Sequence, residues 1–179
     1  MDISSLLIEG VDAVLDLASQ LDQTDNLDAD VNWLGLSSQC IGAAQKSFDM
    51  GNSVNGKKWL LAALKIHNFL AEHSANENLK LGHEISMLRI KVKAIGHLGI
   101  DCEEELLDIR SIRQWFFRKV NLTPEEAEEK SRSWVTIPKD EITRLRNLKN
   151  ILNALEPLKN CNGIHEDLKE WLALKNKLP

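Results

Sequence analysis

Apolar residues recur at intervals of three and four positions along almost the whole chain, and this spacing constrains the fold more than any other feature. In residues 2–22 it places Leu7, Val11 and Val14 on one face of a helix, with acidic residues on the other. One short run, residues 134–137, has the composition of a strand, but a single strand has nothing to pair with. We therefore expect an all-α protein in which residues 134–137 form an extended linker.

The spacing predicts about seven to eight antiparallel amphipathic helices, arranged as a bundle or a short array. Stretches that contain polar residues, glycine or proline separate them. The expected helices cover residues 2–22, 31–48, 57–73, 77–97, 101–120, a short stretch from 124, 139–155 and 166–177.

Several helix ends carry recognisable signals. Gly51 suits the left-handed position just after a helix. Thr123, Pro124 and Glu126 make a capping box with proline at the first helical position. Further expected caps are Asp28 or Asp30 for the second helix, and the pair Asp101 and Glu104 for the fifth.

A length of 179 residues predicts a single domain, 1–179, with two sub-lobes, 1–121 and 122–179, as the alternative. The chain shows neither a secretory leader nor an apolar run of ~20 residues, the length that crosses a membrane. Its three cysteines, Cys40, Cys102 and Cys161, stand far apart without a C-x-x-C pair. Such isolated thiols are typical of reduced proteins, so we expect a cytoplasmic protein.

Charge is distributed unevenly along the chain, whose net charge is −5. Residues 1–50 carry nine acidic side chains and one basic one, whereas residues 51–100 carry seven basic and three acidic ones. We expect the acidic first third to pack beside the basic middle. The alternative is that each of them faces a different partner.

Residues 51–57 match the spacing G-x-x-x-x-G-K of a phosphate-binding loop. Such a loop follows a strand, and it needs Ser or Thr directly after the lysine to bind Mg²⁺. Here Lys58 holds that position, and the preceding residues 41–48 have helical spacing. We therefore predict a plain turn between two helices. A weaker alternative, in which Lys57 and Lys58 bind an anion at a helix N-terminus, stays open.

The same junction resembles a single tetratricopeptide repeat over residues 38–68. Cys40 and Ser47 stand where the family has bulky aromatic residues, and the pattern does not recur about 34 residues later. The resemblance therefore covers one unit, and it implies a tight antiparallel helical hairpin and peptide binding. The matching residues are Ala44 in the first helix, Gly51 and Asn52 in the turn, and Gly56, Leu60, Ala63 and Leu64 in the second helix.

No local pattern indicates catalysis, a cofactor or a bound metal. The histidines form no H-E-x-x-H motif, and the cysteines are not clustered with them. Acidic clusters at residues 103–108 and 125–129 lie at expected helix starts, where they complement the helix dipole. We expect no catalytic, cofactor-binding or metal-binding residue. The five histidines are His67, His73, His83, His97 and His165.

Two basic sets are candidate partner-binding surfaces. Tryptophan and arginine are enriched at interface hot spots, which favours the segment around Trp115. The alternative is that neighbouring helices cover Trp115 while the basic side chains extend into solvent. The first set is Arg110, Arg113, Trp115, Arg118 and Lys119, and the second is Lys57, Lys58, Arg89, Lys91 and Lys93.

We predict a non-catalytic protein–protein interaction module: an adaptor, an assembly factor or a regulatory subunit. The alternative is a nucleic-acid-binding helical subunit of a ribonucleoprotein complex, which would use the basic faces of residues 57–93 and 110–119. An enzyme whose site is assembled from distant residues comes third. The identity of the protein partner and the oligomeric state stay open, and no membrane is expected.

Overall fold

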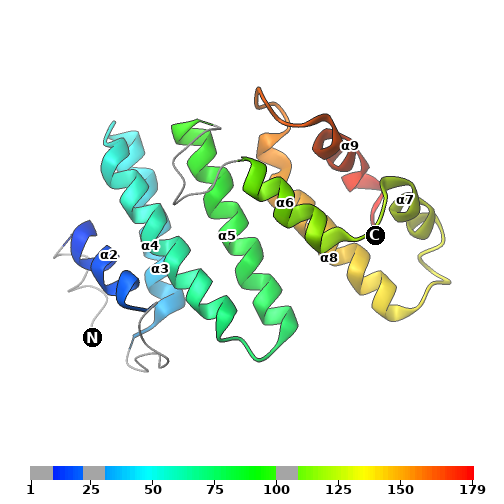
Figure 1. The fold of residues 1–179 in the computed structure, drawn as a ribbon, viewed down its shortest axis with the longest axis horizontal. Helices are drawn as coiled ribbons and strands as arrows, with labels where there is room; N and C mark the ends of the chain where they lie inside the picture. Colours follow the sequence, from blue (N-terminus) through cyan, green and yellow to red (C-terminus); the bar gives the residue numbers. More distant parts are fainter. Residues whose placement is uncertain (1–9, 22–30, 100–108) are drawn as a thin grey trace. The chain divides into compact units, whose positions relative to one another are not determined.

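A computed structural model describes residues 10–21, 31–99 and 109–179, and within these residues the protein is all-α (Figure 1). The predicted fold class is confirmed. The described helices are α2 (Val11–Gln20), α3 (Trp33–Asp49), α4 (Ser53–Glu72), α5 (Glu77–Leu98), α6 (Ile109–Val120), α7 (Pro124–Arg132), α8 (Lys139–Leu155) and α9 (Glu166–Leu174), with short 3₁₀ helices η3 (Glu156–Leu158) and η4 (Lys175–Lys177).

The chain separates into two compact units, Met1–Leu106 and Leu107–Pro179. Helices α2 to α5 belong to the first unit, and α6 to α9 belong to the second. The two-lobe alternative from the sequence divided the chain after residue 121, whereas these units assign α6 to the second one. That the whole chain forms one domain stays a prediction.

Helix α4 is the centre of the first unit, because it packs against α2, α3 and α5 (Figure 1). A helix with neighbours on several sides must be apolar around most of its circumference. The α4 sequence meets this demand, since Leu60, Ala63, Ile66 and Phe69 are buried although they do not share one narrow stripe.

The turn between α3 and α4 is fixed by local chemistry. Gly51 has φ 75°, the left-handed conformation that its sequence position predicted. The side chain of Asn52 caps α4 by accepting a hydrogen bond from the backbone N–H of Asn55 at 3.0 Å. Gly56 lies in the first turn of α4 against the ring of Phe48, and that ring stacks on His97 of α5 at 4.2 Å between centroids. The junction thus links α3, α4 and α5, and it does so without forming a phosphate-binding loop.

Asparagine side chains also cap two other helices of this unit, α3 and α5. Asn32 caps α3 by accepting from the backbone N–H of Gly35 at 2.9 Å, and Asn76 caps α5. The expected caps Asp28 or Asp30 are therefore wrong for α3, and both of these residues lie outside the described part of the chain. The expected start of the fifth helix at Asp101 also lies outside it.

The second unit encloses its own core. Phe116 of α6 meets Trp171 of α9 edge-on at 5.6 Å between ring centroids, and both side chains are buried. Leu145 and Leu152 of α8 are buried as well. These residues follow the three- and four-residue apolar spacing from which the helices were predicted.

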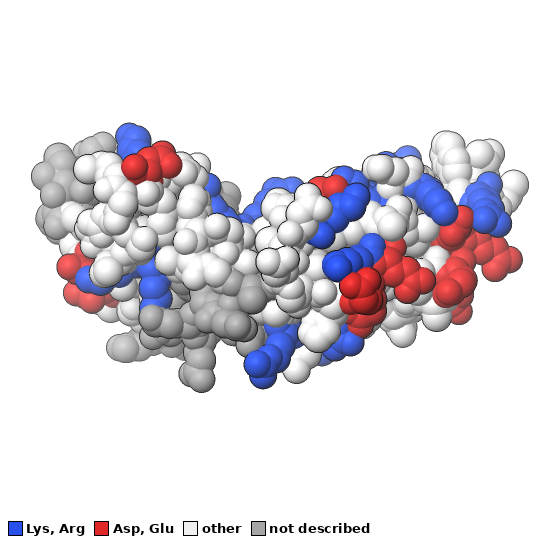
Figure 2. Space-filling model, turned by 90° about the horizontal axis from the view of Figure 1, so that it is seen from above, with Lys and Arg blue, Asp and Glu red and all other residues white. Residues whose placement is uncertain are grey.

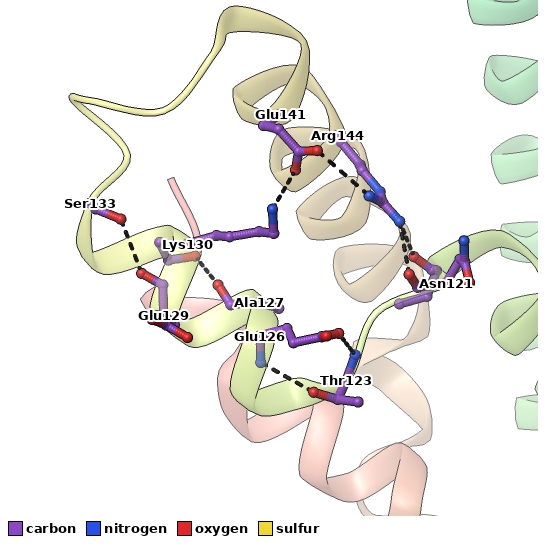
Figure 3. A network of polar contacts seen from close by, with 11 residues as sticks. Asn121, Thr123, Glu126, Ala127, Glu129, Lys130, Ser133, Glu141 and Arg144 are labelled. Atoms are coloured by element: carbon purple, nitrogen blue, oxygen red, sulfur yellow. Dashed lines mark hydrogen bonds and ion pairs between the residues drawn. The ribbon is translucent and has the colours of Figure 1, made fainter.

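Polar contacts join the α6–α7 turn to α8 (Figure 3). Thr123 and Glu126 form the predicted capping box, with hydrogen bonds of 3.2 and 2.8 Å. Arg144 of α8 donates to the backbone carbonyl of Asn121 at 2.9 Å, and Asn121 itself has a left-handed φ of 43°. Glu141 pairs with Lys130 of α7 at 3.2 Å. The short helix α7 is thereby held on the surface of its unit.

The expectation of an extended linker at residues 134–137 is wrong. These residues form turns, and the backbone N–H of Thr136 donates to the carbonyl of Ser133 at 2.9 Å. Trp134 and Val135 remain exposed at the tip of this connection. A turn suits a connection between two helices that pack in one unit, because it reverses the chain within few residues. None of the described helices is both long and apolar enough to cross a membrane.

Candidate functional site

The outer side of helix α6 carries the strongest candidate surface. Its inner side is fixed by Ile109, Ile112, Phe116 and Val120, which are all buried. Next to this inner side, five residues follow the i, i+3, i+4, i+7, i+8 spacing of one helical face. We call this surface the α6 face, and it consists of Arg110, Arg113, Gln114, Phe117 and Arg118.

The α6 face belongs to a helix that has four basic residues and no acidic one. Arg110, Arg118 and the adjoining Lys119 are exposed. Elsewhere on the second unit the two signs of charge are mixed, and the right half of Figure 2 shows acidic and basic side chains next to one another. The α6 face therefore differs from its surroundings by lacking carboxylates of its own.

Arg113 is the best-anchored side chain of the α6 face. Its Nε donates to Oδ2 of Asp167 at 3.0 Å, and its Nη2 donates to the same oxygen at 2.5 Å. Asp167 comes from the first turn of α9. The hydrogen bond from Arg113 lowers the pKa of the Asp167 carboxyl, and the same bond raises the pKa of Arg113. The ion pair thus links α6 to α9 and limits the rotation of the guanidinium group.

The guanidinium group of Arg113 also lies over the ring of Phe117, 5.2 Å from the ring centroid. Phe117 is 38% exposed, and its ring also meets the buried ring of Phe116 edge-on at 5.2 Å between centroids. A shallow depression of about 550 Å³ lies beside it, lined by Arg113, Gln114, Phe117 and Arg118. The α6 face thus combines an open aromatic ring, a fixed cation and a hollow.

Trp115, which the sequence favoured as the anchor, is half-buried and lies on the flank between the buried side and the α6 face. Phe117 takes the place that we expected for Trp115. The i+4 spacing from Arg113 to Phe117 could have indicated this pair. Asp167 could not have been found from the sequence, because it is 54 residues away from Arg113.

The second predicted set is divided among contacts within its own unit. Lys58 binds Asp12 of α2 at 2.6 Å, which joins the acidic first third to the basic middle at this point. Lys93 donates to Gln45 of α3 at 2.6 Å. Arg89 is exposed, while Lys57 and Lys91 are half-buried, and burial lowers the pKa of Lys91 to about 8. These five residues make a weaker candidate surface than the α6 face.

Two histidines that are distant in sequence meet inside the first unit. The Nδ1 atoms of His67 on α4 and His83 on α5 are 3.2 Å apart, a hydrogen-bond distance that needs a proton on one ring only. Burial, and secondarily the neighbouring His83, lowers the pKa of His67 to about 4. Burial also lowers the pKa of His83. The pair is therefore uncharged at neutral pH.

The described residues contain no group of three or more histidine, cysteine or acidic side chains placed to hold a metal ion. Cys40 is buried, and burial raises the pKa of its thiol to about 12, so it is a poor nucleophile. Cys102 lies outside the described residues. The geometry of the described residues indicates no catalytic arrangement, and the sequence had suggested none.

Comparisons with protein-family models, curated proteins and solved structures give no match to this chain. The resemblance of residues 38–68 to one tetratricopeptide unit therefore stays a prediction. Helices α3 and α4 form a hairpin at this place, but helical hairpins occur in many all-α folds.

Proposed function

We propose that the protein is a non-catalytic protein–protein interaction module and that it binds its partner through the α6 face. One observation carries this proposal: Phe117 is exposed beneath a guanidinium group that Asp167 holds in place, next to a hollow in the surface. Aromatic and arginine side chains supply most of the binding energy at many interfaces.

The arrangement of Arg113 supports binding without a large loss of conformational entropy. A free arginine loses rotamer freedom when it is immobilised at an interface. Arg113 is already held by its contacts with Asp167 and Phe117, so little additional ordering is required of it. An adaptor, an assembly factor and a regulatory subunit would each use such a preorganised surface.

We also propose that the protein is cytoplasmic. Cys40 and Cys161 are both free thiols, and they are 121 positions apart in a chain that needs no disulfide to bury its cores.

Site-specific photo-cross-linking tests the proposal. A photoreactive phenylalanine analogue at position 117 should cross-link a discrete protein in the cells that the chain comes from. The same analogue at position 146, an exposed site on α8, is the matched control and should not. If both positions give the same products, or if neither gives any, the α6 face is not a specific interface.

Nucleic-acid binding is the second candidate function. It is favoured by helix α6, which has four basic residues and no acidic one. Nucleic-acid binding requires an affinity that falls steeply as the salt concentration increases, because phosphate contacts release counterions. Absence of a gel shift at low salt would remove this candidate. A shift that Arg113→Ala and Lys91→Ala both weaken would support it over protein binding.

A further inference from the structure

We propose that Asn162 is a self-modification site, at which the side-chain amide becomes a carboxylate through attack by the backbone nitrogen of Gly163. The inference does not depend on the proposed function. It follows from a contrast within the chain, because the same Asn-Gly dipeptide occurs in a helix at positions 55 and 56 and in an exposed turn at positions 162 and 163.

The reaction needs only the asparagine side chain, the next backbone nitrogen and water. The nitrogen of Gly163 loses its proton to hydroxide and bonds to Cγ of Asn162, the Cγ–Nδ2 bond breaks, and ammonia leaves. Water then opens the cyclic imide at Cγ to give aspartate, or at the backbone carbonyl to give iso-aspartate. Each conversion consumes one water and releases one ammonia, without oxidation or reduction. Glycine in the second position has no Cβ that would hinder the approach.

The turn between η3 and α9 leaves this reaction open. Asn162 and Gly163 are both exposed, and Gly163 has a left-handed φ of 87°. Within the described part of the chain, neither the side chain of Asn162 nor the backbone N–H of Gly163 makes a hydrogen bond. No hydrogen bond therefore has to break before the amide carbon and the attacking nitrogen meet.

The fold closes the same reaction at Asn55. Gly56 is buried in the first turn of α4, and its backbone N–H donates to the carbonyl of Asn52 at 3.0 Å. The helical backbone directs this nitrogen towards the carbonyl of Asn52 and away from the side chain of Asn55. The first turn of α4 must open before the imide can form, and such local opening costs free energy. Asn55 is thus a matched internal control for Asn162.

The product at position 162 lies in a segment that is anchored at both ends. Leu158 and Ile164, which flank the turn, are buried. Iso-aspartate carries the main chain through its side-chain carbon, so it inserts one extra atom between these two anchors. The resulting strain falls on the start of α9, whose first turn includes Asp167.

The experiment incubates the folded full chain at mildly alkaline pH in heavy-oxygen water, and peptide mass spectrometry follows both sites. Trypsin releases them in separate peptides, because Lys159 and Lys169 flank Asn162 while Lys46 and Lys57 flank Asn55. The same chain unfolded in guanidinium chloride gives the reference rates. The matched variant is Asn162→Gln, whose longer side chain forms a cyclic imide far more slowly.

We expect Asn162 to convert about tenfold or more faster than Asn55 in the folded chain, because only Asn55 requires local opening. In the unfolded chain the two rates should be similar, and Asn162→Gln should lose the reaction at position 162 only. The inference is overturned if both sites of the folded chain convert at the same rate. It is equally overturned if Asn162 keeps its amide while the unfolded chain loses it.

Hydrogen exchange on the converted chain tests the strain at the start of α9. The iso-aspartate form should lose protection of its α9 amides relative to fresh Asn162→Asp, which gains the same charge without the extra atom. Equal protection in the two samples would contradict this consequence.

Discussion

At some positions, contact with a neighbouring side chain decides which residue is tolerated, and helix propensity matters less. Gly56 is one example, because a Cβ atom at this position would lie 2.6 Å from the ring of Phe48. Within an α-helix alanine is ordinarily preferred over glycine by about 1 kcal/mol. Contact with Phe48 reverses this preference, since the ring is held by its stacking on His97.

Replacement of Gly56 by alanine should therefore lower the free energy of unfolding by about 1 kcal/mol or more, as overpacking does elsewhere. The control is Gly42→Ala in α3, where a new Cβ would meet no atom within 4 Å. That change should stabilise the protein by up to about 1 kcal/mol. Urea denaturation of both variants measures the difference, and equal effects would refute the role of Phe48.

The His67–His83 pair makes stability depend on pH. Because the pKa of His67 falls from 6.5 to about 4 on folding, the folded state binds fewer protons than the unfolded chain. Stability present above pH 6.5 is therefore lost as the pH falls towards 4, by an amount on the order of 3 kcal/mol. His67→Gln should flatten the dependence of the unfolding free energy on pH in this range.

At the scale of single helices, the observed ends agree with the predicted ends where apolar periodicity and capping signals agree. The start of α7 at Pro124 and both ends of α8 match the expected helices, and Thr123 caps the start of α7. Side-chain caps by asparagine at positions 32, 52 and 76 were not recognised, since asparagine is as common in turns as at caps. The run from Trp134 to Ile137 was expected to be extended because its composition favours a strand, but local hydrogen bonding of Thr136 to Ser133 makes it a turn.

At the level of one helix, Thr123→Ala tests the capping box of α7. Loss of the hydroxyl leaves the backbone N–H of Glu126 without its 3.2 Å partner, and such a loss costs about 1 kcal/mol. The control is Thr143→Ala in the exposed side of α8, which removes a hydroxyl that caps no helix start. Thermal unfolding followed by circular dichroism should show a lower midpoint for the first variant alone.

The candidate site could be predicted from the sequence only in part, because the rest depends on tertiary contacts. The sequence located the segment 110–119, in which the structure buries Ile112 and Phe116. It favoured Trp115 and missed Phe117, because the flank of a helix is covered or open according to its neighbours. Contacts such as Arg113 with Asp167 join residues far apart in the chain, and no local pattern encodes them.

The whole molecule consists of two compact units, and each has a core of its own. Separate compact units can open separately in native-state exchange. Leu152→Ala in the second unit should speed amide hydrogen exchange in α8 and α9 and leave α3 and α4 unchanged. The reciprocal change, Leu60→Ala, should act on the first unit only. Uniform acceleration over both units after either change would show that they unfold as one.

The central claim is that the α6 face binds a protein partner through Phe117. The most direct measurement is the affinity of the partner that cross-linking at position 117 identifies. Isothermal titration calorimetry compares the binding of this purified partner to the wild type, to Phe117→Ala and to Arg146→Ala. We predict that Phe117→Ala lowers the affinity about tenfold or more with unchanged helical circular dichroism, and that Arg146→Ala binds like the wild type. Equal affinities for all three proteins would contradict the claim.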